Sequence, residues 1–230
     1  MNRPLADFAI RALSAGVLGA AMLAAIVFGG VWGVAGLASA IGSLAGAELA
    51  AITRRERRAP DVVAGLAAIA ALPFVVARFG AAGIAPVFAA LVAGALAWHV
   101  SFRSLRLADT ATTVFGVAYI GLAFAHLVLL RQLDGGVALC LVMVLSVWAN
   151  DVFAYLVGST LGRTPLALRI SPKKTWEGFA AGSLATTLVW AVAGSALIDL
   201  PAIWLVTIGG VASLAAAIGD LAESRIKREM

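Results

Sequence analysis

The chain has 230 residues, of which 62% are hydrophobic and only 13% are charged. Soluble domains carry about a quarter charged residues, so this composition, with a mean hydropathy of +1.01, excludes a soluble protein. Apolar runs of about 20 residues without strict alternation also exclude a β-barrel. We therefore predict an all-α, polytopic bundle of transmembrane helices.

Eight apolar segments are long enough to cross a bilayer. They are expected at 9–29, 31–52, 62–78, 81–100, 111–130, 136–157, 179–198 and 202–220. The first has no small-residue cleavage site behind it, so we interpret it as a retained span and not as a signal peptide. The single cysteine, Cys140, lies in an apolar run and is expected to be a small buried hydrophobe.

The basic residues predict the orientation of the chain. Of the 17 Lys and Arg residues, 15 lie in the N-terminus, in the connections 53–61, 101–110 and 159–178, or in the C-terminal tail, and Arg78 and Arg131 are the exceptions. By the positive-inside rule both termini are expected in the cytoplasm, which predicts a multi-pass protein of a bacterial inner membrane. The same bias explains the net charge of +5, which could attract anionic lipid, and no nucleic-acid partner is expected.

Acidic side chains inside membrane spans are costly, so each is a candidate functional residue. Glu48 and Asp151 lie in the second and sixth predicted spans, and Asp220 and Glu223 lie where the last span meets the cytoplasm. Glu48 has an ordinary alternative role as a helix-end carboxylate beside the arginines at 54–58. A secondary transporter that uses Glu48, Asp151 and Asp220 is an alternative hypothesis, although no acid lies in the outer half of any span.

The connection before the seventh span ends in SPKKTWEG and is a candidate phosphate site. Lys173 and Lys174 supply positive charge for a polyanion. Ser171 and Thr175 are able to bind phosphate oxygen or to cap a helix, and Glu177 suits the positive end of the helix that follows. Basic groups at a helix N-terminus favour anions, but an ordinary positive-inside loop would also be basic.

The tail, GDLAESRIKREM, supplies acids beside bases. Asp220 and Glu223 are three residues apart and share one face of a helix, which Ser224, Lys227 and Arg228 continue. Mg²⁺ prefers one or two carboxylates together with phosphate oxygens. The alternative is a solvated helix end stabilised by pairs such as Glu223 with Lys227.

Three blocks together resemble the phosphatidate cytidylyltransferases in order and spacing. They are Asp151-x-x-Ala154-Tyr155 followed by Gly158, then Ser171 to Gly178, then Gly219-Asp220-Leu221 with Glu223-Ser224-x-x-Lys227-Arg228. Residues 1–147 resemble the family only as hydrophobic helices behind a basic N-terminus. We therefore divide one integral membrane domain into N-terminal helices, 1–147, and a catalytic-type region, 148–230, with a cytoplasmic loop at 159–178.

The resemblance implies transfer of a cytidylyl group from CTP to phosphatidic acid, giving CDP-diacylglycerol and pyrophosphate. A related transferase acting on another lipid stays open. The implied cofactor is Mg²⁺, with a second, monovalent cation as a candidate, and the implied partners are CTP, phosphatidic acid, membrane lipid and a second copy of the chain in a homodimer.

The resemblance also implies a role for each matching residue. The metal ligands would be Asp220 and Glu223, and the catalytic positions would be Lys173, Lys174 and Asp151. The substrate-binding positions would be Ser171, Thr175, Trp176, Glu177, Ser224, Lys227 and Arg228. The family pattern continues past Lys-Arg into further acids, whereas this sequence stops at Met230, so we expect little cytidylyltransferase activity from these 230 residues alone.

Overall fold

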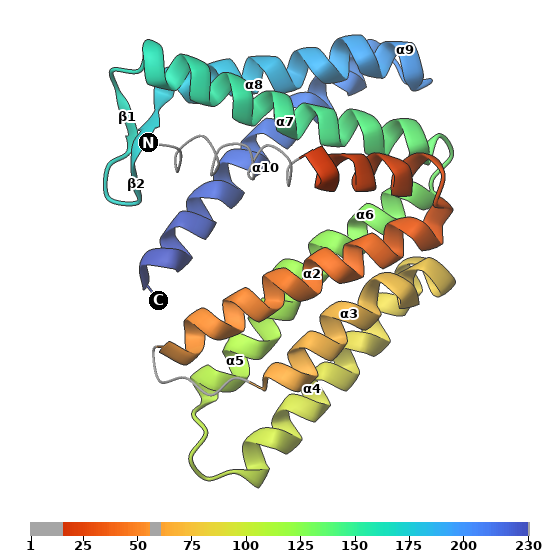
Figure 1. The fold of residues 1–230 in the computed structure, drawn as a ribbon, viewed down its shortest axis with the longest axis vertical. Coiled ribbons are helices and arrows are strands. Elements are labelled where there is room, and N and C mark those ends of the chain that lie inside the picture. Colours follow the sequence, from red (N-terminus) through yellow and green to blue (C-terminus); the bar gives the residue numbers. More distant parts are fainter. Residues whose placement is uncertain (1–15, 56–60, 230) are drawn as a thin grey trace, which may run out of the picture. The chain divides into compact units, whose positions relative to one another are not determined.

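The computed structural model describes residues 16–55 and 61–229, and the chain divides between Val137 and Ala138 into two compact units (Figure 1). The division by function at residue 147 stays a prediction. Each unit is built from apolar helices, and the described part of the second also contains one short β-hairpin.

The first unit is a helical bundle. Its elements are the helix Gly16–Val27, α2 (Gly30–Arg55), α3 (Val62–Phe79), η1 (Gly80–Gly83), α4 (Ile84–Ser101), α5 (Leu107–Gly116), η2 (Val117–Gly121) and α6 (Leu122–Gln132). A π-helical turn, η2, joins α5 to α6, and α2 packs against both α3 and α6. The core forms around Ile69, Leu91, Val117 and Ile120.

The chain reverses between α3 and α4. Asp61 begins α3, because its carboxylate accepts a hydrogen bond of 2.9 Å from the Ala64 N–H. Gly80 ends the helix with a φ of +60°, a conformation that glycine adopts without steric cost. After η1 the chain returns as α4, which packs against α3.

The second unit holds the three sequence blocks. Its elements are α7 (Gly136–Thr160), β1 (Pro165–Ala167), β2 (Ser171–Thr175), α8 (Trp176–Val189), η3 (Trp190–Gly194), α9 (Ser195–Leu197) and α10 (Ala202–Glu229). Its buried core contains Val142 from α7, Trp190 from η3 and Leu205 from α10.

Glycines bring α7 and α8 into close contact. A Cβ atom added at Gly182 would lie 2.7 Å from Asn150 Oδ1 and 2.9 Å from the Asn150 carbonyl oxygen. A Cβ added at Gly178 would lie 2.7 Å from the carbonyl oxygen of Ala154. Small residues at such contacts let membrane helices pack backbone against backbone.

Six segments of the described chain are long and apolar enough to cross a membrane. They are Gly30–Thr53, Val62–Ser101, Leu107–Gln132, Gly136–Thr160, Trp176–Leu197 and Ala202–Ile226. The 40-residue segment Val62–Ser101 contains α3 and α4, which were predicted as two spans. The first predicted span, 9–29, lies partly outside the described residues. An all-α, multi-pass membrane protein is confirmed, whereas the number eight stays a prediction; Cys140 is buried, as predicted.

Candidate active site

The connection 159–178, predicted only as a loop, contains an antiparallel β-hairpin. β1 and β2 pair with Pro165 opposite Thr175 and Ala167 opposite Ser171. The flanking helices also reach further than predicted, because α7 continues to Thr160 and α8 begins at Trp176. The SPKKT part of the second block is therefore a strand, and its WEG part is the first turn of a helix.

Backbone and side-chain hydrogen bonds fix the junction of β2 and α8. The Thr175 hydroxyl caps α8 by accepting a hydrogen bond of 3.2 Å from the Gly178 N–H. The Trp176 N–H donates to the Thr164 carbonyl at 2.9 Å. In return the Thr164 N–H donates to both carboxylate oxygens of Glu177 at 3.2 Å. Glu177, predicted to bind substrate, thus also holds the start of the hairpin.

An ion pair between Lys174 and Asp220 joins the second sequence block to the third. The Lys174 Nζ is inaccessible to solvent, and 26% of its side chain is exposed, against 58% for Asp220. The neighbouring Lys173 is exposed, because successive side chains of a strand point to opposite sides. In the described part of the chain, Lys174 therefore forms an ion pair with α10, and Lys173 does not.

Arg228 makes the second contact between α10 and the hairpin. Its Nη1 donates a hydrogen bond of 3.3 Å to the carbonyl oxygen of Arg169, in the turn between β1 and β2. Asp220 and Arg228 lie about two helical turns apart on α10. The tail predicted to carry substrate contacts therefore touches the hairpin at two positions, Asp220 and Arg228.

The two predicted metal ligands, Asp220 and Glu223, are both exposed on α10. No cluster of three His, Cys, Asp or Glu side chains occurs among the residues that the structure describes. Two carboxylates still suit Mg²⁺, because this ion takes most of its remaining ligands from water and phosphate. The donor set therefore fits a metal that arrives with a phosphate ligand, in which case Asp220 would have to release Lys174.

Asp151, on α7, is held by its neighbour. Its carboxylate accepts a hydrogen bond of 3.3 Å from Asn150 Nδ2, and the side chain is exposed. Within the described residues the structure places Lys174 against Asp220 and forms no ion pair between Lys174 and Asp151. A catalytic role of Asp151 stays a prediction.

The remaining predicted site residues are placed less distinctively. Ser171 is half-buried in β2 and Ser224 is half-buried in α10. Trp176 is 52% exposed, and its ring meets the Phe179 ring edge to face with a centroid distance of 5.7 Å. The Lys227 side chain lies outside the described residues. Glu48 is exposed on α2, in the first unit.

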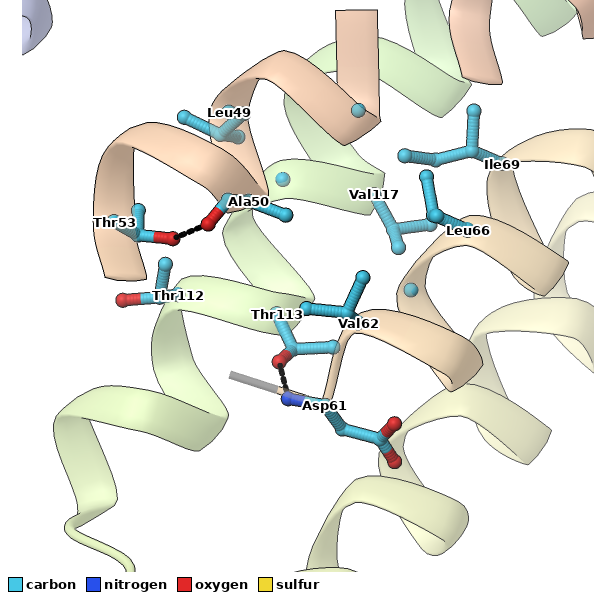
Figure 2. Close-up of a pocket in the computed structure, with 13 residues that line it drawn as sticks. Leu49, Ala50, Thr53, Asp61, Val62, Leu66, Ile69, Thr112, Thr113 and Val117 are labelled. Carbon is cyan, nitrogen blue, oxygen red and sulfur yellow. Dashed lines mark hydrogen bonds between the residues drawn. The ribbon is translucent and has the colours of Figure 1, made fainter. Parts of the chain in front are cut away.

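A cavity of about 30 Å³ lies in the first unit, between α2, α3 and α5 (Figure 2). Figure 2 shows Thr113 accepting a hydrogen bond of 2.9 Å from the Asp61 N–H and Thr53 donating one of 3.0 Å to the Ala50 carbonyl. The volume equals about one water molecule, whereas small-molecule sites occupy about 300–1,000 Å³. This cavity is therefore too small to hold a nucleotide.

Comparison with known proteins identifies the family. A family model described as "Cytidylyltransferase family" matches residues 9–230. The chain belongs to the cytidylyltransferase family. The three blocks on which the resemblance rested are thus part of a match that covers both units.

Several proteins named phosphatidate cytidylyltransferase are similar to this chain over part of their length. A Mycobacterium bovis protein named phosphatidate cytidylyltransferase is 30% identical over 66% of this chain and 54% of its own length. A Bacillus subtilis protein of the same name is 38% identical over 48% of this chain and 42% of its own length. Phosphatidate cytidylyltransferase 4, chloroplastic, of Arabidopsis thaliana is 34% identical over 70% of this chain and 47% of its own length. The matched part is thus about half the length of each relative.

Proposed function

We propose that the protein transfers a cytidylyl group from CTP to phosphatidic acid and releases pyrophosphate. Membership of the cytidylyltransferase family and the names of the relatives support this reaction. The observation that carries the proposal is the Lys174–Asp220 ion pair, which brings a basic block and an acidic block together although they are far apart in sequence. Both kinds of charge are needed where a triphosphate is bound.

The main obstacle in this reaction is repulsion between two polyanions. The phosphate oxygen of phosphatidic acid is already anionic near neutral pH, so it attacks the α-phosphorus of CTP without a strong general base. Catalysis then depends on positioning and on neutralising charge. Lys173 and Lys174 would bind phosphate oxygens, and Arg228, about two turns further along α10 than Asp220, would steer the lipid phosphate.

Asp220 and Glu223 would hold Mg²⁺, which neutralises phosphate charge when it is bound. If Asp220 binds a cation, Lys174 loses its ion-pair partner. A buried ammonium without a counter-charge is costly, so Lys174 would then take a phosphate oxygen. A second, monovalent cation stays a prediction.

We further propose that the chain crosses the inner membrane eight times and that both termini lie in the cytoplasm. The charge distribution supports this orientation, and the reversal at Gly80 supports counting α3 and α4 as two spans. A homodimer stays a prediction. The glycine-rich helix faces do not distinguish contacts within one chain from contacts between two chains.

Cysteine labelling tests the orientation. Thr53, in a basic connection, is 0% exposed and is unsuitable for this purpose, whereas Ser104 and Ser159 are exposed. In a Cys140→Ala background, Ser104→Cys and Ser159→Cys should resist an impermeant maleimide added outside intact cells. Asp134→Cys and Asp199→Cys, in connections on the opposite side, should react. Efficient outside labelling at Ser104 or Ser159 would reverse the orientation.

The proposed reaction is tested by following two phosphorus atoms of CTP. Purified protein is mixed with Mg²⁺ and vesicles that contain phosphatidic acid, and CTP is labelled at either the α- or the γ-phosphate. The α-label should enter the lipid fraction, and the γ-label should appear in pyrophosphate. The same assay is run on the 230-residue chain and on a version extended by any downstream coding sequence. Absence of α-label from lipid with both proteins folded contradicts the proposal, and transfer only to another phospholipid or isoprenoid phosphate would replace the acceptor.

The two adjacent lysines should differ in their effect on this reaction. Lys174→Gln is expected to lower the rate by roughly 10²-fold, because it removes a desolvated charge that faces Asp220. Lys173→Gln should cost less, since its ammonium stays hydrated. Arg103→Gln, an exposed cation of another basic connection, is the matched control. Equal rates for Lys174→Gln and Arg103→Gln would mean that the lysines of the second block only set the orientation of the chain in the membrane.

A further inference from the structure

The end of β2 is held from two sides. Lys174 and Thr175 are consecutive residues of this strand, so their side chains point in opposite directions. Lys174 meets Asp220 on α10, whereas Thr175 meets the C-terminal end of α7. The position of the Lys174 ammonium therefore depends on where the neighbouring threonine is seated.

Two glycines form the seat of Thr175. A Cβ atom at Gly158 would lie 3.2 Å from Thr175 Oγ1. At Gly162 it would lie 2.7 Å from both Oγ1 and Cγ2 of Thr175. The threonine side chain thus occupies the space that side chains at these two positions would fill.

The Thr175 hydroxyl is also engaged in the fold. It accepts the hydrogen bond from the Gly178 N–H that begins α8, and the seat covers the side chain in part. In this cap the hydroxyl oxygen is the acceptor, so the hydroxyl hydrogen stays available to donate to a phosphate oxygen. The hydroxyl therefore performs the capping role, one of the two roles that the sequence predicted for it, and its substrate-binding role stays a prediction.

We propose that Thr175, seated on Gly158 and Gly162, is a positioning residue that holds Lys174 against Asp220. Its hydroxyl, which caps α8 and lies against Gly158 and Gly162, fixes the last residue of β2, and the alternation of the strand then directs Lys174 to α10. The catalytic meaning of this device rests on the proposed function, but the placement of Lys174 does not.

The accessibility of Lys174 to an acetylating reagent measures this placement. The chain has three lysines, and Lys173 beside it is an internal reference because it is exposed. In the unchanged protein Lys174 should react more slowly than Lys173, since its Nζ is inaccessible. Mass spectrometry of peptides that contain both lysines gives the ratio within one molecule.

Thr175→Val keeps the shape of the side chain and removes the cap. Loss of a helix cap shifts the folding equilibrium of the helix end about fivefold. We therefore expect the acetylation rate of Lys174 to rise about fivefold and that of Lys173 to stay unchanged. Thr175→Ser keeps the cap and should stay near the unchanged protein. Asp220→Asn is the positive control, because it releases Lys174 without altering the seat.

Gly158→Ala tests the seat itself. The added methyl group would lie 3.2 Å from the hydroxyl oxygen, so Thr175 would have to shift by a few tenths of an ångström. This shift should raise acetylation of Lys174, but it should have no such effect in a Thr175→Ala background, where the hydroxyl is absent. Gly210→Ala on α10, where an added Cβ meets no atom within 4 Å, is the matched control. Unchanged protection of Lys174 in Thr175→Val and in Gly158→Ala, or an equal rise at Lys173 and Lys174, overturns the proposal.

The kinetic consequence separates this proposal from the proposed function. Thr175→Val should raise the KM for CTP more than it lowers kcat, because Lys174 is misplaced before the triphosphate binds, and Thr175→Ser should restore the KM. A lowered kcat with an unchanged KM would contradict a positioning role through Lys174. Failure of all CTP transfer would refute the proposed function, while selective acetylation would still support the positioning of Lys174.

Discussion

Replacing Asp220 with asparagine should reduce CTP-dependent labelling of lipid by about 10²- to 10³-fold, the range for loss of one electrostatic contact in an active site. Asparagine keeps the size of the side chain and removes its charge. The change removes one of two carboxylates that would hold Mg²⁺, and it leaves the inaccessible Lys174 ammonium without its counter-charge. The chemistry should therefore fail although the helix persists.

Asp199→Asn is the matched control for Asp220→Asn. Asp199 is an exposed acid of the same unit, in the connection between α9 and α10, and belongs to none of the three blocks. Initial rates with both variants, normalised to the amount of monodisperse protein in detergent, provide the comparison. A rate for Asp220→Asn within twofold of Asp199→Asn would exclude Asp220 from the site.

Replacing Gly182 with valine should prevent the second unit from folding correctly. The first added carbon already lies 2.7 and 2.9 Å from two oxygens of Asn150, one of them in the backbone of α7. The helices would have to separate, and overpacking of this kind costs about 3 kcal/mol, a large fraction of the stability of a typical domain. Little monodisperse protein should be recovered after extraction.

Gly210→Val makes the same change on α10 at a site where an added Cβ meets no atom within 4 Å. It shares the intrinsic helix preference of valine, so the difference between the two variants isolates the packing of α7 against α8. The recovered amount of protein and the midpoint of thermal unfolding are the measurements. Equal recovery and equal midpoints would mean that α7 and α8 do not meet at Gly182.

The helices were predictable because long apolar runs have only one way to satisfy their backbone hydrogen bonds in lipid. The reversal at Gly80 is an example, since a short connection near residue 79 separates two apolar runs in the sequence, and the glycine there adopts a positive φ. The π-helical turns at Val117–Gly121 and Trp190–Gly194 were not predicted. Their sequences are apolar like the helices around them, so periodicity does not distinguish them.

The candidate site was predictable as a set of residue types but not as an arrangement. The hairpin of β1 and β2 was missed because its strands have only three and five residues and each contains a proline, which is depleted in strands. The sequence alone does not distinguish the adjacent lysines Lys173 and Lys174. They differ only because successive side chains of a strand point to opposite sides. Thr175 offered a hydroxyl for either a phosphate or a helix, and its seat on Gly158 and Gly162 is a long-range contact that sequence does not reveal.

The most direct test of the proposed site is carbodiimide coupling, which forms an amide between an amine and a carboxylate only where the two are in contact. In protein without ligand, an amide should form between Lys174 and Asp220 and be detected by mass spectrometry of the joined peptides. CTP with Mg²⁺ should suppress this amide, because the metal takes Asp220 and the triphosphate takes Lys174. Failure to form the amide, or formation that CTP and Mg²⁺ leave unchanged, would contradict a nucleotide site built from these two blocks.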